Sequence, residues 1–484
     1  MGVDVGYGFG WRLLAGSLTP VYSGWWTVNH YVYTDSTGAE YRLEDNSGGI
    51  WRSREGIFLE YDAGAGRLYF PGGSYWEFGC TANGTEADAG TMYPTRLVDT
   101  NGNEIKLRYQ GGLHYGGVNG SARIAEVEDV RSVAVGPVYK SYTFTYNNDA
   151  IPHLTSIGTH VPGDNSNIQF TYHGSTSLLD PFASANFGSA VDLATMSVPG
   201  SGGLQFAMTY YSGSHEFRKI TMPYGGTIEW EYGPKTLAGD RTMREVTKRT
   251  LNAADSQGDK IYTLSHNDTA DLPLLAHAYT VVQDASGVAD KKYVFSTTGD
   301  WTLGLLTGLQ ERKVAGPVTL RESTMTWQRT ANLNPYITAT VETMDPGQSY
   351  AQSSKVEQTL NDHGNLTERK QYGYYAPGGT PPLARTFTYA YLATSNYTSR
   401  HIWNRLLTGS VVKPGGTAIS LVSNNYDGYT AGSVNAVSNP SVLRQHDTAN
   451  YGSGFLFRGN VTSSTKPGST VTMVYDYTGS VVSG

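Results

Sequence analysis

A short motif recurs along the chain and strongly limits what it can fold into. Asp or Asn is followed by two variable residues, Gly and a strand-like stretch, with the same spacing at Asp99–Gly102, Asn361–Gly364 and Asp476–Gly479. Thr34–Tyr41 keeps this spacing of Asp and Gly, and Tyr61–Leu68 has one extra residue. The Asp or Asn side chain accepts hydrogen bonds from the turn backbone, and Gly adopts the left-handed conformation without steric cost. We therefore predict repeat turns at Asp35, Gly38, Asp62, Gly66, Asp99, Gly102, Asn361, Gly364, Asp476 and Gly479.

Between such turns the sequence alternates apolar and polar residues. The clearest stretches are Ile105–Tyr109, Tyr142–Tyr146, Thr227–Tyr232 and Val471–Tyr475, and a period of two is typical of half-buried strands. Arg241–Arg249 comes nearest to a helix, but its β-branched residues fit a strand as well. The sequence predicts an all-β protein of successive antiparallel hairpins.

Stacking is what makes such hairpins stable. A single hairpin is marginal in water, whereas hairpins in series cover one another and form a quasi-one-dimensional sheet. The 58 glycines among 484 residues argue against a helical bundle, and 35 tyrosines supply much of the surface to be buried. We expect residues 1–484 to form one continuous, long, curved or spiralling sheet. Possible loop excursions are 174–201 and 376–382.

Charge and cysteine content exclude several classes of protein. The chain has 35 Lys and Arg against 42 Asp and Glu, so its net charge of −7 gives no bias toward nucleic acid. Cys80 stands alone, which excludes an intramolecular disulfide and a multi-cysteine metal site. No apolar run reaches the 18 residues of a membrane span, and Met1–Gly10 lacks the basic and apolar regions of a signal peptide.

The repeat resembles a known family. Tyr475-Asp476-x-x-Gly479 and its relatives at Asp99 and Asn361 resemble the YD repeat of the RHS-repeat proteins. Similar segments are Phe217–Tyr232, with a Pro-x-Gly-Gly turn between strands, Tyr397–Leu407 and Gly8–Leu13.

This resemblance implies a hollow β-shell, as in bacterial toxin complexes, polymorphic toxins and teneurins. Family members are typically secreted or exposed at the cell surface, and many enclose a C-terminal toxin of the same polypeptide, the cargo expected here. We therefore expect a bacterial, secreted or cell-surface protein whose export signal is not present in this chain.

The sequence departs from the family at the segment that ends the shell. Asp180-Pro181 and Asp345-Pro346 carry the expected dipeptide without the matching Gly, so the self-cleavage residues of the family are not carried over. The repeat that starts at Tyr475 is cut short at Gly484. We expect further repeats downstream, and a tendency of this piece to self-associate through open strand edges.

Signals for catalysis and metal binding are weak. The sequence holds no Gly-x-Ser-x-Gly elbow, phosphate loop or His-Glu-x-x-His motif, and His215-Glu216 has no second histidine at helical spacing. Asp99-x-Asn101-x-Asn103 opens like a calcium loop, but Glu104 stands where the loop needs Gly. We predict no metal, no cofactor and no catalytic residue.

Two other functions remain open from the residues alone. Exposed tryptophans would suit a carbohydrate-binding adhesin or wall-associated module, and paired carboxylates would suit a polysaccharide-degrading enzyme. Buried core is the competing interpretation for the tryptophans, and a charged strand edge for the carboxylates. The function we predict is that of a non-enzymatic structural shell, which encloses a cargo or toxin or presents an adhesive surface to a cell-surface glycan or protein. The residues concerned are Trp25, Trp26, Trp51, Trp76 and Trp230 for sugar binding, and Glu55, Glu60, Glu77, Asp88, Glu126, Glu128 and Asp129 for catalysis.

Overall fold

The computed structural model describes residues 2–13, 15–113, 118–164, 166–266, 275–315, 318–429 and 432–484. The protein is all-β, with 51% of its residues in strands and 3% in helices. A long antiparallel sheet joins 33 strands among the described residues. The predicted fold class is confirmed.

The N-terminal strands curl on themselves. β9 returns to pair with β1 through Leu18 and Met92, and β7 pairs with both β6 and β10. The strands of this N-terminal curl are β1 (Ser17–Tyr22), β2 (Val28–Thr34), β3 (Glu40–Ser47), β4 (Ile50–Ser53), β5 (Glu60–Asp62), β6 (Arg67–Tyr69), β7 (Tyr75–Glu77), β8 (Cys80–Thr81) and β9 (Met92–Tyr93).

From β10 onward, each main-sheet strand pairs with the next main-sheet strand along the chain. The first group is β10 (Arg96–Val98), β11 (Glu104–Tyr109), β12 (Ile124–Glu128), β15 (Tyr142–Tyr146), β16 (Leu154–Thr159), β17 (Asn167–Tyr172), β20 (Leu193–Ser197), β21 (Gln205–Tyr210) and β22 (Phe217–Thr221). The second group contains the longest strands: β23 (Thr227–Leu237), β24 (Arg241–Asn252), β25 (Asp259–His266), β26 (Tyr279–Asp284), β27 (Ala289–Phe295), β28 (Leu306–Lys313), β29 (Val318–Arg329), β30 (Pro335–Met344), β31 (Gln352–Leu360), β32 (Leu366–Tyr372), β33 (Leu383–Tyr391), β34 (Leu406–Val412), β35 (Ile419–Tyr426), β36 (Val461–Lys466) and β37 (Ser469–Thr472).

Short elements lie beside the main sheet. Three separate hairpins are β13 (Val133–Val135) with β14 (Val138–Lys140), β18 (Thr176–Leu179) with β19 (Asn186–Ala190), and β38 (Val474–Tyr475) with β39 (Val481–Ser483). The helical turns are η1 (Ala238–Asp240), α1 (Ser395–Thr398), η3 (Pro440–Val442) and α2 (Thr448–Tyr451).

The expected loop at 174–201 is wrong in part. It contains β18, β19 and β20, and β20 belongs to the main sheet, where Met196 pairs with Phe170 of β17 and Phe206 of β21. The hairpin of β18 and β19 does leave the main sheet. Its strands are mostly exposed, so they lack the apolar alternation that would have revealed them. The other expected excursion, 376–382, connects β32 to β33.

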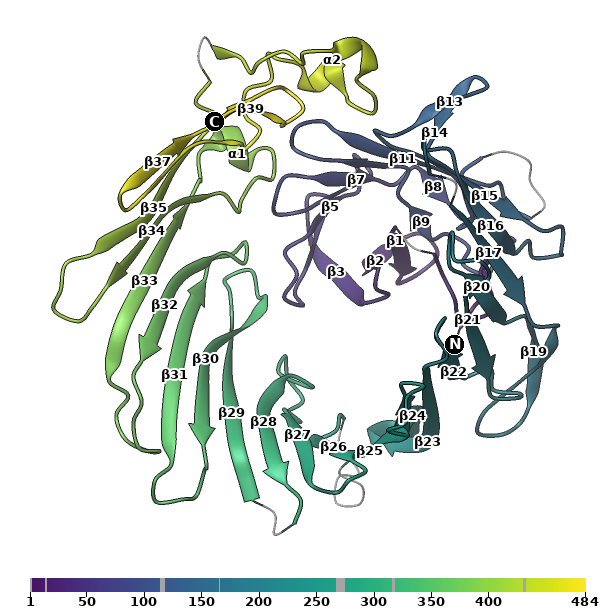
Figure 1. Ribbon diagram of the computed structural model, residues 1–484, viewed down its shortest axis with the longest axis horizontal. Helices are drawn as coiled ribbons and strands as arrows, with labels where there is room; N and C mark the ends of the chain where they lie inside the picture. The colour runs from purple at the N-terminus through teal and green to yellow at the C-terminus, as the bar shows by residue number, and fades with distance from the viewer. Residues whose placement is uncertain are drawn as a thin grey trace.

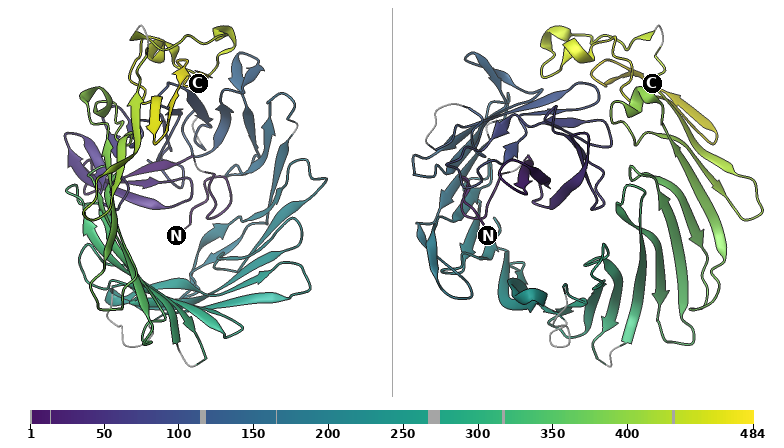
Figure 2. Two further views of the ribbon diagram at one scale, coloured as in Figure 1. Left: turned by 60° about the vertical axis from the view of Figure 1, so that its left-hand side comes forward. Right: turned by 180° about the vertical axis from the view of Figure 1, so that it is seen from behind.

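The sheet runs round the molecule as a ring (Figure 1). It passes from the N-terminal curl through β15–β23 and along β24–β28, and returns through β29–β37, and the view from behind shows the same course (Figure 2). Bridges between the backbones of Gly72 and Ile402, and of Asn103 and His446, join the two ends of this path.

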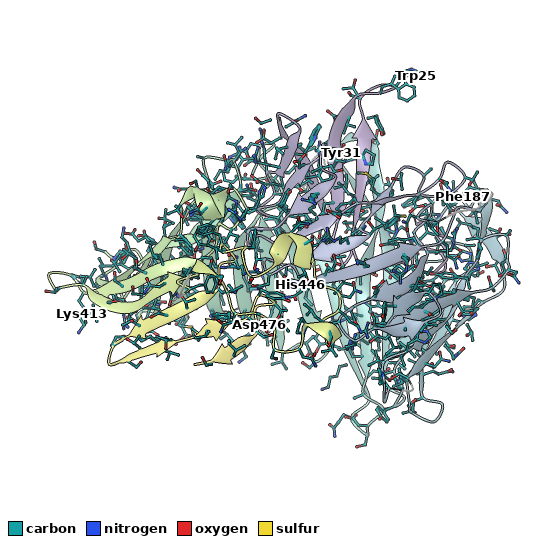
Figure 3. All side chains as sticks on the ribbon, turned by 90° about the horizontal axis from the view of Figure 1, so that it is seen from above. Trp25, Tyr31, Phe187, Lys413, His446 and Asp476 are labelled. Carbon is teal, nitrogen blue, oxygen red and sulfur yellow. The ribbon has the colours of Figure 1, made fainter. Side chains whose placement is uncertain are left out.

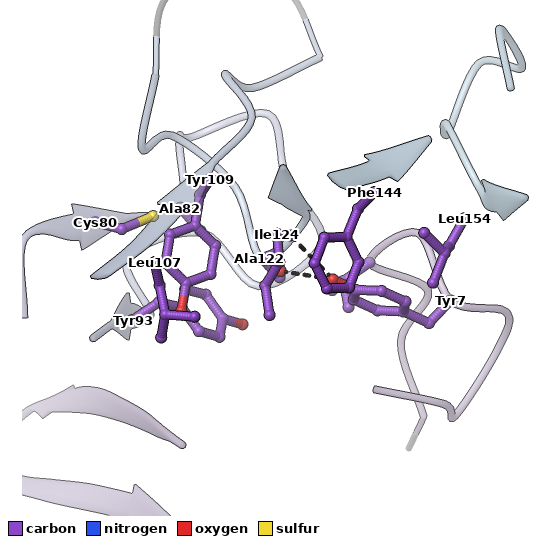
Figure 4. Packing of buried hydrophobic residues seen from close by; sticks show 11 residues of the cluster. Tyr7, Cys80, Ala82, Tyr93, Leu107, Tyr109, Ala122, Ile124, Phe144 and Leu154 are labelled. Carbon is purple, nitrogen blue, oxygen red and sulfur yellow. Dashed lines mark hydrogen bonds between the residues drawn. The ribbon is translucent and has the colours of Figure 1, made fainter. Parts of the chain in front are cut away.

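Apolar packing is concentrated in the N-terminal third. One cluster fills the curl, with Leu18, Leu43 and Leu68 fully buried. A second cluster packs the N-terminal segment against side chains of β8–β16, and there the Tyr7 hydroxyl donates to Ala122 O and accepts from the Ile124 amide (Figure 4). Cys80 is buried in this second cluster. The N-terminal third is therefore the packed body against which the return of the sheet can close.

Candidate functional site

The five predicted repeat turns share one backbone geometry. Gly38, Gly66, Gly102, Gly364 and Gly479 all have positive φ, between 64° and 88°. In four of them the Gly amide donates to the carbonyl of the Asp or Asn three residues earlier, at 3.0–3.2 Å. The turn that starts at Asp62 carries the extra residue and differs in this contact.

The Asp or Asn side chain of each turn accepts hydrogen bonds from the turn backbone. Asp35, Asp99, Asn361 and Asp476 each accept through Oδ1 from the amides two and four residues later, at 2.8–3.2 Å. Asp62 accepts from the amides two and three residues later. These bonds satisfy the turn amides locally.

Three of these turns do more than reverse the chain, because their glycines touch another segment. A Cβ built on Gly364 would lie 2.3 Å from the Phe58 ring, one on Gly102 2.4 Å from Tyr451, and one on Gly479 2.5 Å from Asn101. A Cβ on Gly38 would meet nothing within 4 Å. The turns at 102, 364 and 479 are therefore docked, and we call the surface on which they meet the closure junction.

Two of the docked turns hold each other. The Asn103 amide group donates to Thr478 O at 2.8 Å, across 375 residues of sequence. Asn101 Oδ1 accepts from Asn460 Nδ2 at 3.0 Å. Its backbone oxygen accepts from His446 Nε2 at 2.9 Å. Figure 3 marks His446 and Asp476 in this part of the junction. The turn of β10–β11 is thereby bonded to the turn of β38–β39.

Arg458 lies at the centre of this contact with no exposed surface. Its guanidinium donates to the backbone carbonyls of five residues at 2.6–2.9 Å, and burial lowers its pKa. A planar group with five N–H donors suits a cage of carbonyl oxygens. The five acceptors are Asn101, Tyr451, Gly452, Phe455 and Tyr477.

A second arginine bridges the junction by charge. Arg96 of β10 pairs with Asp447 at 2.8 Å, and on its own side of the junction with Glu104 and with Glu77 at 3.4 Å. Asp447 also caps α2 by accepting from the Asn450 amide. The pKa of Asp447 is lowered, since hydrogen bonds from Asn450 and Arg96 outweigh burial.

The third contact joins β5 to the segment before β34. His401 Nδ1 lies 2.8 Å from Glu60 Oε2, and Arg52 donates to the other oxygen of Glu60 at 2.7 Å. Burial raises the pKa of Glu60, but the bonds from His401 and Arg52 prevail and bring it to about 2. The His401 ring also stacks on Tyr69 with centroids 3.8 Å apart. This contact therefore holds the ionised carboxylate of Glu60 between the side chains of Arg52 and His401.

The docked turn at 361–365 completes this third contact. The His363 ring stacks on Trp403 at 3.8 Å, and Asn365 donates to Trp403 O at 2.9 Å. Burial lowers the pKa of His363. The closure junction holds the returning part of the sheet against the N-terminal curl. None of its contacts forms a covalent bond.

The carboxylates considered for glycoside hydrolysis take part in ion pairs and hydrogen bonds. Glu77 pairs with Arg67, Glu126 with Arg108 and Lys140, Glu128 with Arg108, and Asp129 with Arg131. Glu55 accepts from the Arg42 amide, and Asp88 is bonded to Tyr93. Glu126 and Asp129 have lowered pKa values because these bonds outweigh burial, whereas burial raises the pKa of Asp88. The lowered pKa values of Glu60, Glu126 and Asp129 are the opposite of what a general acid needs.

The tryptophans fall into two groups. Trp25 and Trp26 are 92% and 89% exposed at the tip of the β1–β2 hairpin, and Figure 3 shows Trp25 projecting from the molecule. Trp51 is buried, and Trp76 and Trp230 are half-buried. Their ring partners are Tyr31 for Trp51, Phe70 for Trp76 and Phe217 for Trp230.

The remaining residues that the sequence singled out have local roles. The buried His215 bonds Asp192 at 2.7 Å. Asp99 and Asn103, part of the calcium-like pattern, bond each other within their turn.

Sequence reasoning missed a turn at Thr330–Asn334, which has the same backbone bonds with Leu333 at positive φ in place of Gly. It also missed the group of Glu245, His266 and His277, whose members are separated in sequence and come together through strand pairing.

No protein-family model matches the chain, and no curated protein does. Among solved structures, the Tc holotoxin pore of Photorhabdus luminescens matches with 9% identity and a TM-score of 0.38, over 93% of this chain and 21% of that chain. A TcdB2–TccC3 complex with Cdc42 matches with 10% identity and a TM-score of 0.38, over 93% of this chain and 23% of that chain. This chain thus spans less than a quarter of these two chains, and scores this low establish no common function. No helix among the described residues is long and apolar enough to span a membrane.

Proposed function

We propose that this chain is a wall section of a protein shell of the RHS or YD-repeat type, a non-enzymatic structure that encloses a cargo. The observation that carries the proposal is the course of the sheet. It is continuous over 33 strands, it runs round the molecule, and its return is bonded to its N-terminal curl at the closure junction (Figure 1). A wall of this kind needs a sheet that bends round and is held shut.

The recurring Asp-x-x-Gly turns support the family in this proposal. Their Tyr-rich strands resemble YD repeats, and the docked turns give the repeat a second use in closing the wall. The proposed cargo is a C-terminal domain of the same polypeptide, such as a toxin, and the proposed location is secreted or at the cell surface.

Protection of a cargo tests the proposal. A flexible peptide with an epitope and one protease site is fused after Gly484, and its cleavage is followed in the intact chain. The wild-type wall is expected to slow cleavage at least tenfold relative to the same peptide on an unrelated carrier.

A closure variant supplies the matched comparison. Arg458→Met removes five hydrogen bonds at the junction and is expected to restore fast cleavage, whereas Arg42→Met at an exposed ion pair is expected to leave protection intact. Equal cleavage on the wild-type wall and on the unrelated carrier would rule out enclosure.

One observation favours a second function, that of a carbohydrate-binding adhesin. Trp25 and Trp26 are almost fully exposed side by side at a hairpin tip, and aromatic faces stack on sugar rings. A glycan array with Trp25→Ala tests this, with Tyr224→Ala as the control because Tyr224 is also exposed, at 85%. Binding that disappears only in Trp25→Ala supports the adhesin, and no binding by the wild type contradicts it.

A further inference from the structure

Two histidines and one glutamate come together on three successive segments of the sheet. Glu245 lies in β24, His266 ends β25, and His277 precedes β26 by two residues. β24 and β25 pair with Lys248 opposite Thr263, and β25 and β26 pair with His266 opposite Thr280, so the three segments lie side by side. Antiparallel pairing thus gathers side chains that no sequence spacing would reveal.

Their ligand atoms converge. His277 Nε2 is 2.7 Å from Glu245 Oε1, and His266 Nε2 is 3.2 Å from Glu245 Oε2. One donor atom from each residue lies within 4.8 Å of the other two. The two imidazole rings stack with centroids 4.1 Å apart, and the three side chains are only 14–17% exposed.

These separations are close to those around a bound ion. Ligands at about 2.1 Å in a tetrahedral site lie about 3.4 Å from one another. The shorter of the two contacts would have to lengthen by less than about 1 Å, which rotation of the side chains can supply.

The polar atoms around the cluster fit a cation. Glu245 Oε2 and His277 Nδ1 are buried without a well-directed hydrogen bond to any residue that the structure describes. A buried carboxylate oxygen without a hydrogen bond destabilises the fold. His266 Nδ1 is 3.0 Å from Thr280 Oγ1. A metal-binding histidine is usually fixed by such an oxygen partner on its other nitrogen.

We propose that Glu245, His266 and His277 bind a zinc ion that ties β24, β25 and the start of β26 together. Two imidazole nitrogens and one carboxylate oxygen suit Zn²⁺ and its borderline neighbours, whereas Ca²⁺ and Mg²⁺ prefer oxygen alone. Three protein ligands leave a coordination position for water. The bound ion would link neighbouring strands of the sheet beside the long strands β23 and β24. Zinc binding does not depend on the proposed enclosure of a cargo.

Titration of the metal-free full chain with ZnCl₂ tests the proposal, with binding followed by calorimetry and melting by circular dichroism. The wild type is expected to bind one Zn²⁺ per chain and to melt at a higher temperature with the ion. His277→Ala and Glu245→Gln are expected to weaken binding at least tenfold, because each removes one of three ligands. His160→Ala, which removes an imidazole that bonds Thr143 away from the cluster, is the matched control and is expected to bind as the wild type does.

A second measurement keeps the proposal testable if a variant folds poorly. CoCl₂ added to the wild-type chain is expected to give visible absorption bands that ZnCl₂ displaces. Bands that persist after ZnCl₂ is added would overturn the proposal, as would equal Zn²⁺ binding by wild type and His277→Ala. Absence of Zn²⁺ binding by the wild type would overturn it too, and would leave the cluster as a carboxylate shared between two imidazoles.

Discussion

Replacing Gly364 by Ala separates the two uses of a repeat turn, reversal of the chain and docking at the closure junction. Gly364 and Gly38 have nearly the same φ, 78° and 85°, so an L side chain costs about 1–2 kcal/mol at either position. Only at Gly364 does the new Cβ meet a neighbour, the Phe58 ring at 2.3 Å. Forcing that ring aside adds about 1–3 kcal/mol, the usual cost of overpacking. We expect a loss of about 1–2 kcal/mol for Gly38→Ala and about 2–5 kcal/mol for Gly364→Ala.

Urea unfolding of the two variants, followed by circular dichroism and by proteolysis, measures the difference. A double-mutant cycle with Phe58→Ala isolates the contact, because truncating the ring makes room for the new methyl group. The double variant is expected to lose less stability than the sum of the single variants, by about the size of the overpacking cost. Equal losses at Gly38 and Gly364, together with additive behaviour in the cycle, would refute the docking argument.

Other positions give further expected results. Gly102→Val and Gly479→Val are each expected to destabilise by at least about 1 kcal/mol, because both glycines have positive φ and touch another segment; unchanged melting and protease resistance in both would contradict this. The pKa of Glu60 is lowered from 4.5 to about 2, so its stabilisation is present above about pH 4.5 and is lost as the pH falls toward 2; Glu60→Gln is expected to flatten that acid limb in a pH series of melting curves, and Glu44→Gln at an exposed ion pair to leave it unchanged. Arg123→Met is expected to cost about 3–5 kcal/mol, because the buried carboxylate of Glu86, 2.8 Å from Arg123, loses its counter-ion and keeps the bond from the Leu113 amide; a loss under about 1 kcal/mol in urea unfolding would contradict this. The exposed edge strand β37 leads us to expect concentration-dependent association, which a purely monomeric sedimentation profile at high concentration would exclude.

The sequence revealed the fold class because its signals are local. In a turn of the Asp-x-x-Gly type, the side chain bonds the backbone amides within five residues. The alternation of a strand repeats every two residues. Both patterns can therefore be recognised in the sequence without knowing the tertiary structure. The hairpin of β18 and β19 escaped because its residues are mostly exposed and carry no apolar alternation.

The closure junction could not be predicted because nothing local marks it. The glycine of an exposed turn, Gly38, and the glycine of a docked turn, Gly364, look the same in the sequence, and only the folded chain shows that one of them touches Phe58. The cage around Arg458 is made of backbone carbonyls, which every residue possesses. Likewise, Glu245, His266 and His277 meet only through strand register.

The distances in sequence across the closure junction bear on how the protein is made. Glu60 meets His401 across 341 residues, and a ribosome that adds 5–20 residues per second needs roughly 17–70 s to supply the second partner after the first. Non-local contacts of this kind also slow folding, because the chain must lose the entropy of closing a long loop before the contact can stabilise it. The N-terminal curl, with its own buried apolar core, can fold during that interval, while the surface that will receive the docked turns stays uncovered. Nascent chains are therefore expected to need protection from one another until about residue 480 has emerged, because the last docked turn lies at Asp476–Gly479.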